Sequence, residues 1–338
     1  MVKECKNNKK YSFCAIGNAL VDVNVNVSFF DLATLRLNAD AGCCPIDTEK
    51  KEQIEKFIKD RNPTISSGGS IANSLYTLSL FSNDCAFIGT LGRDDFGRSF
   101  FDDFKKNNIK LLDSIFKDNV STGVCFVFVM PNAERTMAGC LGDSANITLC
   151  EDAKDLIRNS SNLLIEMYTA TNDEAYKSMI EATKIAKENG TKIIMSFSDK
   201  SVLDAYPSRV KEFVKVSDIV FCNEAEAKAY SNEKTVLSMI QFFKDKKDDI
   251  EYVITLGKNG AVAIKKGEVI QTKAFVVNPV DLTGAGDMFL AAYLNGTMLS
   301  LEKELVLKKA CYMSSKIICQ VGARFNGDIK RAWNESIK

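Results

Sequence analysis

The second half of the chain repeats one pattern, in which a short apolar stretch alternates with a longer amphipathic one. The apolar stretches are too short for buried helices, whereas the stretches between them carry apolar residues at helical spacing. Strands separated by helices in this way pair in parallel, and the helices cover the sheet. We therefore predict strands at 163–167, 192–196, 218–221 and 252–255, with helices at 173–188, 207–216 and 235–246.

The first half of the chain is richer in strands. Residues 11–16 are an apolar run that predicts a buried strand, and 21–27 alternate valine with polar residues, which is typical of a strand with one polar face. The stretches 122–130 and 135–141 flank a short polar turn and predict a hairpin. Residues 66–70 predict a glycine-rich turn that opens a helix.

Together these elements predict one α/β domain over residues 1–338, a three-layer α/β/α arrangement around a mostly parallel sheet. The β-rich segments at about 19–46 and 121–141 are expected to form a small accessory sheet, a lid inserted into that domain. Ligands of such sheets bind at the carboxyl ends of the strands, so we look there for the site.

Composition excludes several classes of function. The 338 residues include no histidine, which removes histidine-based hydrolases and metalloproteases. The 44 basic and 44 acidic residues balance, so no field favours nucleic acid or an anionic membrane. No run of 18 apolar residues exists, and we expect no membrane span. The 11 cysteines lack the spacing of a disulfide framework, which favours reduced thiols in the cytoplasm.

The segment with the clearest chemistry is Thr283-Gly-Ala-Gly-Asp287, which follows the apolar stretch 275–277, a predicted strand, and opens a helix. Glycines at a helix start let the backbone approach a ligand, and the free amides and helix dipole favour an anion. A carboxylate inside an anion site is understandable if Asp287 accepts a hydroxyl proton beside a transferring phosphoryl group. The alternative is an ordinary helix start with an acidic first turn. Other phosphate motifs, and the dinucleotide GxGxxG, do not occur.

Six segments in order resemble the ribokinase family, also called the phosphofructokinase-B family of carbohydrate and nucleoside kinases, over residues 13–325. They are Gly17–Asp22, Ser67–Asn73, Asn223–Glu226, Thr255–Gly260, Gly284–Asp287 and Val321–Ala323. The resemblance implies a ribokinase-like fold and phosphoryl transfer from ATP to a primary hydroxyl. Leu282 departs from the family's usual Asp-Thr-Thr before the glycines, at a position without a chemical role.

The resemblance also implies roles for individual residues. Asp287 would be the catalytic base, and Gly284, Ala285 and Gly286 the anion hole. Acceptor hydroxyls would be bound by Asn18, Asp22 and Asn73, with the hinge glycines Gly68 and Gly69 beside them. ATP would meet Asn223, Thr255, Gly257, Gly260, Gly322 and Ala323.

Magnesium is the metal that the resemblance implies, held through water by Asn223 and Glu226. These two residues lie three apart at a helix start, so the alternative is a helix cap without a metal role. Asp281 and Thr283 stand where some relatives bind potassium, which raises a K⁺ site as well.

The acceptor is where alternatives stay open. The segments 133–137, 140–148 and 195–199 resemble the adenosine-kinase-like branch, which favours adenosine over a free or phosphorylated sugar such as ribose or fructose. A base needs an aromatic clamp, for which the candidates are Phe126, Phe128, Tyr168 and Phe197, unless they belong to the core. Arg135 is either a phosphate or substrate contact or a hairpin charge. A non-catalytic nucleotide- or sugar-binding relative is the hypothesis from another class, and a homodimer through the lid is the expected assembly.

Overall fold

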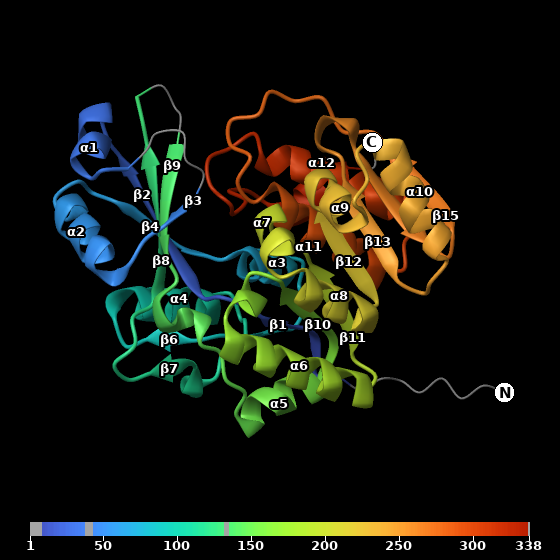
Figure 1. Cartoon of the computed structure of the whole chain (residues 1–338), viewed down its shortest axis with the longest axis horizontal. Helices are drawn as coiled ribbons and strands as arrows, with labels where there is room; N and C mark the ends of the chain where they lie inside the picture. The colour runs from blue at the N-terminus through green and yellow to red at the C-terminus, as the bar shows by residue number, and fades with distance from the viewer. Residues whose placement is uncertain (1–8, 38–42, 132–134, 337–338) are drawn as a thin grey trace.

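A computed structural model describes residues 9–37, 43–131 and 135–336 (Figure 1). Its main sheet has eight strands in the order β15-β14-β13-β12-β11-β10-β1-β5. All neighbours from β5 to β13 pair in parallel, and β14 and β15 are antiparallel additions at one edge. The strands are β1 (Tyr11–Ile16), β5 (Cys85–Ile88), β10 (Ser160–Glu166), β11 (Lys192–Ser196), β12 (Ile219–Asn223), β13 (Glu251–Thr255), β14 (Ala261–Lys265) and β15 (Glu268–Thr272).

Helices cover both faces of this sheet, and alternate residues of each strand feed one of two apolar cores. Within β1, Phe13 and Ala15 join one core and Cys14 and Ile16 the other. The first core includes α3 (Ser70–Leu80), α11 (Ala285–Met298) and α12 (Lys303–Ile317). The second includes α5 (Glu151–Arg158), α6 (Asp173–Glu188), α8 (Pro207–Val216) and α10 (Val236–Lys246). Burial on both faces explains why these strands are continuous apolar runs, and confirms the three-layer prediction.

A second sheet, in the order β3-β9-β8-β2-β4, stands beside the main one (Figure 1). Its strands are β2 (Leu20–Asn26), β3 (Cys43–Pro45), β4 (Thr64–Gly68), β8 (Gly123–Val129) and β9 (Arg135–Cys140). The helices α1 (Phe29–Thr34), α2 (Thr48–Ile58) and α4 (Asp95–Lys106) complete this region. Residues 38–42 of the predicted lid segment lie outside the described residues.

The two faces of the second sheet differ sharply. On β2 and β8, the buried side chains Val21, Val23, Phe126 and Phe128 belong to the first core, together with Ile54 of α2. Figure 1 shows α1 and α2 on that side, away from the main sheet. The opposite face, which begins at Asp22, is half exposed along both strands. This sheet is mixed, since β2 pairs with β8 and β3 with β9 in parallel while the other two pairs are antiparallel. Cover on one face predicts strands of alternating residues, which is the pattern of β2.

Two local predictions are wrong. Residues 64–68 form β4, which pairs antiparallel with β2, where the sequence predicted a turn from Ser66. The stretch 275–277 is a loop, because Phe275 alone packs on the core while Val276 is exposed at the edge of a cavity.

The remaining elements connect the layers. A short two-stranded sheet pairs β6 (Leu91–Gly92) with β7 (Phe116–Lys117). Three further helices are α7 (Lys200–Ala205), α9 (Glu224–Ser231) and α13 (Ile329–Glu335). The residues that follow β1, β10, β12 and β13 all reach the same edge of the main sheet, since parallel strands end together. That edge faces the glycine-rich start of α11.

Candidate active site

Asp287 lies in the first turn of α11 and is held by two side chains of α3. The Ser70 hydroxyl donates to Asp287 Oδ1 at 2.6 Å, and the Asn73 amide Nδ2 donates to Oδ2 at 3.3 Å. Burial raises the pKa of Asp287 to about 6, the two hydrogen bonds oppose that rise, and the charge of Asp22 adds to it. A carboxyl with a pKa near neutrality, fixed at an anion-binding helix start, can accept a proton from a hydroxyl group.

The start of α11 is built as a close-approach site. Gly284, its N-cap, has a φ of 77°, and a side chain there would meet the backbone of Ala323 at 2.6 Å. Gly286 has open space where a Cβ would stand, so its backbone is accessible. The turn before the helix is tied by Asp281, whose Oδ1 accepts from the Thr283 amide at 3.0 Å and hydroxyl at 2.7 Å. Its Oδ2 accepts from the amide of Gly322 at 2.7 Å. The amides of this first helical turn have no acceptor within the helix and favour an anion.

A polar cavity of about 140 Å³ adjoins Asp287 and gathers residues from three strand ends. Asn223 and Glu226 follow β12, Thr255 ends β13, and Ser196 ends β11. The cavity thus brings together the predicted catalytic base, the predicted metal-organising pair and one predicted nucleotide contact.

Asn223 and Glu226 form a capping box at the start of α9. The Glu226 amide donates to Asn223 Oδ1 at 2.9 Å, and the Asn223 amides donate to the two carboxylate oxygens of Glu226 at 2.9 and 2.6 Å. Burial raises the pKa of Glu226 to about 7, and the charge of Asp199 contributes to the rise. The cap is therefore present. It does not exclude a metal role, because a magnesium ion held through water and phosphate needs few protein ligands. Among the described residues, no three His, Cys, Asp or Glu side chains gather as a metal cluster.

A larger, mainly apolar cavity of about 760 Å³ opens on the other side of Gly286. The predicted nucleotide contacts Thr255, Gly257 and Gly260 line it. Its apolar walls, which the sequence analysis missed, come from Phe275, Val277, Pro279, Leu282 and Ile318. Gly322 and Ala323 instead pack over the start of α11, as their contacts to Asp281 and Gly284 show. A cavity of this size with an apolar wall and a phosphate-binding helix start at its end fits a nucleotide.

The predicted acceptor residues meet on the opposite side of Asp287. Asn18 is 2% exposed, and its side-chain Oδ1 has no hydrogen-bond partner among the described residues. Burial raises the pKa of Asp22 to about 6, against the charge of Arg324. A side chain at Gly68 would stand 2.5 Å from the Asp22 carboxyl, and one at Gly69, whose φ is 95°, would meet the Asn18 carbonyl. Gly69 therefore needs glycine, whereas a side chain at Gly68 would displace the Asp22 carboxyl.

Two charged residues at this site were missed by sequence reasoning. Glu166, 1% exposed at the end of β10, accepts from the amides of Asn18 at 3.2 Å and Ile71 at 2.9 Å, and burial raises its pKa to about 7. It joins the turn after β1 to the start of α3. A carboxylate that ends an apolar strand was the available signal. Arg324 lies beside Asn73 and Asp103, and no local pattern marks it.

The aromatic clamp is corrected by the structure. Phe126 and Phe128 are buried on the covered face of the second sheet and stack on each other, with ring centroids 6.4 Å apart. Phe197 is buried against Tyr230. These three rings are core residues, so a ligand cannot stack on them. Tyr168 is 38% exposed and stays a candidate. The side chain of Arg135 lies outside the described part of the chain.

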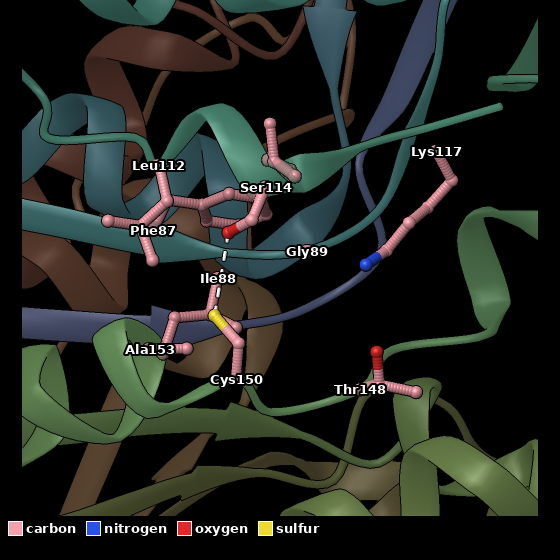
Figure 2. A pocket seen from close by; sticks show the side chains of 10 residues that line it. Phe87, Ile88, Gly89, Leu112, Ser114, Lys117, Thr148, Cys150 and Ala153 are labelled. Atoms are coloured by element: carbon pink, nitrogen blue, oxygen red, sulfur yellow. Dashed lines mark hydrogen bonds between the residues drawn. The ribbon is translucent and has the colours of Figure 1, made fainter.

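A small cavity of about 20 Å³ lies at the end of β5, apart from Asp287 (Figure 2). Ser114 and Cys150 contact each other there at 3.4 Å, and Lys117 and Thr148 stand across from them. The space is enough for about one water molecule.

Asp287 lies within an anion-binding helix start, with a nucleotide-sized cavity on one side and polar groups on the other. This arrangement is that of a small-molecule phosphotransferase. The chain belongs to the pfkB family of carbohydrate kinases, whose family model matches residues 38–330. It is therefore a kinase that acts on a sugar or nucleoside hydroxyl with ATP and a metal ion.

Relatives divide between sugar and nucleoside kinases. Fructokinase-2 of Oryza sativa is 29% identical over 67% of this chain and 69% of its own length, and the ribokinase of Haemophilus influenzae is 26% identical over 70% and 76%. Among solved structures, an adenosine kinase from Sinorhizobium meliloti superposes with a TM-score of 0.83 at 25% identity over 97% of this chain and 99% of its own. A probable sugar kinase from Rhizobium etli gives 0.84 at 23% over the same shares and supports the fold.

The described residues include no helix that is both long and apolar enough to cross a membrane.

Proposed function

We propose that this chain transfers the γ-phosphoryl group of ATP to the primary hydroxyl of a nucleoside, with adenosine as the first candidate. The observation that carries the proposal is Asp287, which lies between a nucleotide-sized cavity and a set of hydroxyl-binding groups. Its carboxyl would take the acceptor proton as the hydroxyl oxygen attacks. The backbone amides at Gly284, Ala285 and Gly286 would stabilise charge on the transferred group.

The acceptor would bind on the side of the second sheet. Asn18, Asp22 and Asn73 offer the polar atoms that ribose hydroxyls need. Among the residues that the structure describes, none donates to Oδ1 of Asn18, so this buried atom would accept a hydrogen bond from an acceptor hydroxyl. Closure of the second sheet about Gly68 and Gly69 would exclude water from the reaction. The sheet would then be a lid.

The bare face of the second sheet supports a nucleoside over a free sugar. Across this face, Asp22 of β2 pairs with Cys125 of β8, and in the next row Asn24, Val127 and Met137 are neighbours. Cys125, Val127 and Met137 are half-buried, and they form an apolar strip beside the polar groups of β2. A flat base fits apolar side chains, while a free sugar offers mostly hydroxyls. In this proposal the strip would take the role predicted for Phe126, Phe128 and Phe197.

The nucleotide side would use the remaining predicted residues. Thr255, Gly257 and Gly260 would contact ATP in the larger cavity, and Asn223 and Glu226 would hold the waters of Mg²⁺ in the polar one. The metal, when bound, neutralises phosphate charge. A potassium ion beside Asp281 and Thr283 belongs to the same proposal. Cytoplasmic location is also proposed, and the free thiols of Cys14 and Cys150 agree with it.

The sugar kinase is the second candidate, favoured by the polar row Asp22, Asn24 and Asn26 on the same face. A panel of nucleosides, pentoses, hexoses and hexose phosphates with ATP and magnesium, read as ADP release, separates the two. Under the proposal, adenosine has the highest kcat/KM on the panel. A higher value for ribose, fructose or a hexose phosphate would replace the nucleoside assignment by the sugar one. ATP binding without turnover of any acceptor would favour the non-catalytic relative.

A further inference from the structure

Arg324 reaches the acceptor side of the site from the loop after α12. Its guanidinium lies 3.9 Å from the ring centroid of Tyr76 and forms an ion pair with Asp103 of α4. The side chain is 15% exposed, and its Nη2 has no hydrogen-bond partner among the described residues. Stacking and the ion pair fix the plane of the group, so its remaining donors have set directions.

One of those donors meets Asn73. Arg324 Nε donates to Asn73 Oδ1 at 3.4 Å, while Asn73 Nδ2 donates to Asp287 Oδ2 at 3.3 Å. A flipped amide would turn its NH₂ group toward the guanidinium and its oxygen toward the carboxylate, and both contacts would be repulsive. Arg324 and Asp287 thus select the same orientation of the Asn73 amide from opposite ends.

The charge of Arg324 acts on the same cluster. Asp22 on β2, Glu166 on β10, Asp103 on α4 and Asp287 on α11 are the acidic groups around it and Asn73. Arg324 lowers the pKa of Asp22, which burial raises. Without this cation, the pKa of Asp22 would rise further, and the buried carboxyls of Asp22, Glu166 and Asp287 would face one another with less compensation.

We propose that Arg324 is a positioning residue of the acceptor site, which fixes the Asn73 amide and thereby orients both the acceptor and the Asp287 carboxyl. This inference rests on the proposed phosphoryl transfer and deepens it. The competing interpretation is a purely structural role, in which Arg324 only holds the loop after α12 against α3 and α4.

Three variants distinguish a positioning role of Arg324 from a purely structural role. In Arg324→Met an unbranched side chain stays, but the charge, the donors and the stacked guanidinium are lost. In Arg324→Lys the charge stays without the planar fork. Asp103→Asn exchanges the ion pair for a neutral hydrogen bond, and stacking on Tyr76 still orients the guanidinium toward Asn73, so this variant is the matched control for a purely structural role.

We expect Arg324→Met to lower kcat with the acceptor by about tenfold or more and to leave KM for ATP unchanged. The acid limb of kcat/KM for the acceptor should move to higher pH, because removal of a cation raises the pKa of nearby carboxyls. Arg324→Lys should keep the acid limb near its wild-type position and still lose kcat. Asp103→Asn should lower Tm with little change in either quantity.

A double-variant cycle supplies the decisive readout. If Arg324 acts through Asn73, the kcat loss from Arg324→Met shrinks severalfold when Asn73 is already alanine. Equal losses in both backgrounds, or an Asp103→Asn variant that matches Arg324→Met, would overturn the proposal. A wild-type protein that phosphorylates no acceptor on the panel contradicts the proposed function itself. An active wild type with an unaffected Arg324→Met contradicts only this inference.

Discussion

The two sheets contribute to the site in different ways. The main sheet is covered by helices on both faces. Its strands line the polar cavity at their carboxyl ends, where Asn223 and Thr255 lie. The second sheet is covered on one face, and its other face, from Asp22 to Val127, is half exposed along its length. A strand end offers one or two fixed groups, whereas a bare face offers a surface that can be remodelled without disturbing a core.

This difference suggests a division of labour. Under the proposed function, phosphoryl transfer would depend on groups held by buried strands and by the start of α11. Acceptor choice would depend on side chains of the bare face, which are partly exposed. Variants of the two regions should therefore fail in different ways.

The largest effect is expected at Asp287. Asp287→Asn should lower kcat by about 10³- to 10⁴-fold, because the amide cannot accept the hydroxyl proton, while the affinity for ATP stays within about twofold. Because the pKa of Asp287 is raised from its ordinary value of 3.8 to about 6, its ionisation costs stability progressively between those pH values and fully above pH 6, so the variant should lose no stability at pH 8. Steady-state rates, calorimetric ATP binding and melting curves at pH 8 provide the checks. Turnover near the wild-type value would show that another group is the base.

The same ionisation sets the pH dependence of the wild type. Since Asp287 and Asp22 both have pKa values raised to about 6, kcat/KM for the acceptor should fall below that pH. A profile flat down to pH 5 would contradict the role of these carboxyls.

A smaller loss, confined to the acceptor, is expected at the hinge. A methyl group at Gly68 would overlap the Asp22 carboxyl, so Gly68→Ala should displace that carboxyl and lower kcat/KM for the acceptor by about 100-fold. Binding of ATP is the internal control, because the nucleotide cavity lies across Asp287. Equal losses for ATP and acceptor would mean that the two sides of the cleft are not independent.

Variants of Glu226 distinguish a helix-capping role from a role in organising magnesium. Glu226→Ala should remove the capping box and cost about 1 kcal/mol of stability. Glu226→Gln loses the charge and keeps one of the two acceptor oxygens, so it can retain the hydrogen bond from the Asn223 backbone amide but not also the one from Asn223 Nδ2. If Glu226 organises magnesium, both variants should need severalfold more free magnesium for half-maximal rate, and the alanine variant should melt earlier than the glutamine variant. An unchanged magnesium titration for Glu226→Gln would leave capping as its whole role.

The sequence predicted the main sheet well and the second sheet less well. The strands β10 to β13 and the helices between them match the predicted ranges within a few residues, because burial on both faces makes each strand an apolar run. The strand β4 was missed, since its residues Thr64–Ser66 are exposed and give no apolar pattern. Both Phe126 and Phe128 were considered as ligand contacts, because alternation marks two faces without saying which one the core covers.

Site residues from contiguous motifs were predictable, and those assembled by tertiary structure were not. The helix start at Gly284 carries its own signature, and Asn223 with Glu226 lies within one turn. Glu166 and Arg324 reach the site only because β10 and the loop after α12 end beside α3. Their contact partners are 95 and 251 residues away in the chain, a separation at which local patterns carry no signal.

The most direct test of the division between the sheets is a competition assay with adenosine and ribose in one reaction. The ratio of the two phosphorylated products measures the ratio of the kcat/KM values. Val127→Asn changes the bare face beside Asn24, and Val129→Asn, one step farther from Asp22 on the same face, is the matched control. We predict a wild-type ratio that favours the nucleoside product, about a tenfold shift toward the sugar in Val127→Asn, a smaller one in Val129→Asn, and KM for ATP unchanged in both. A ratio unaffected by Val127→Asn, or one that favours ribose in the wild type, would contradict the account.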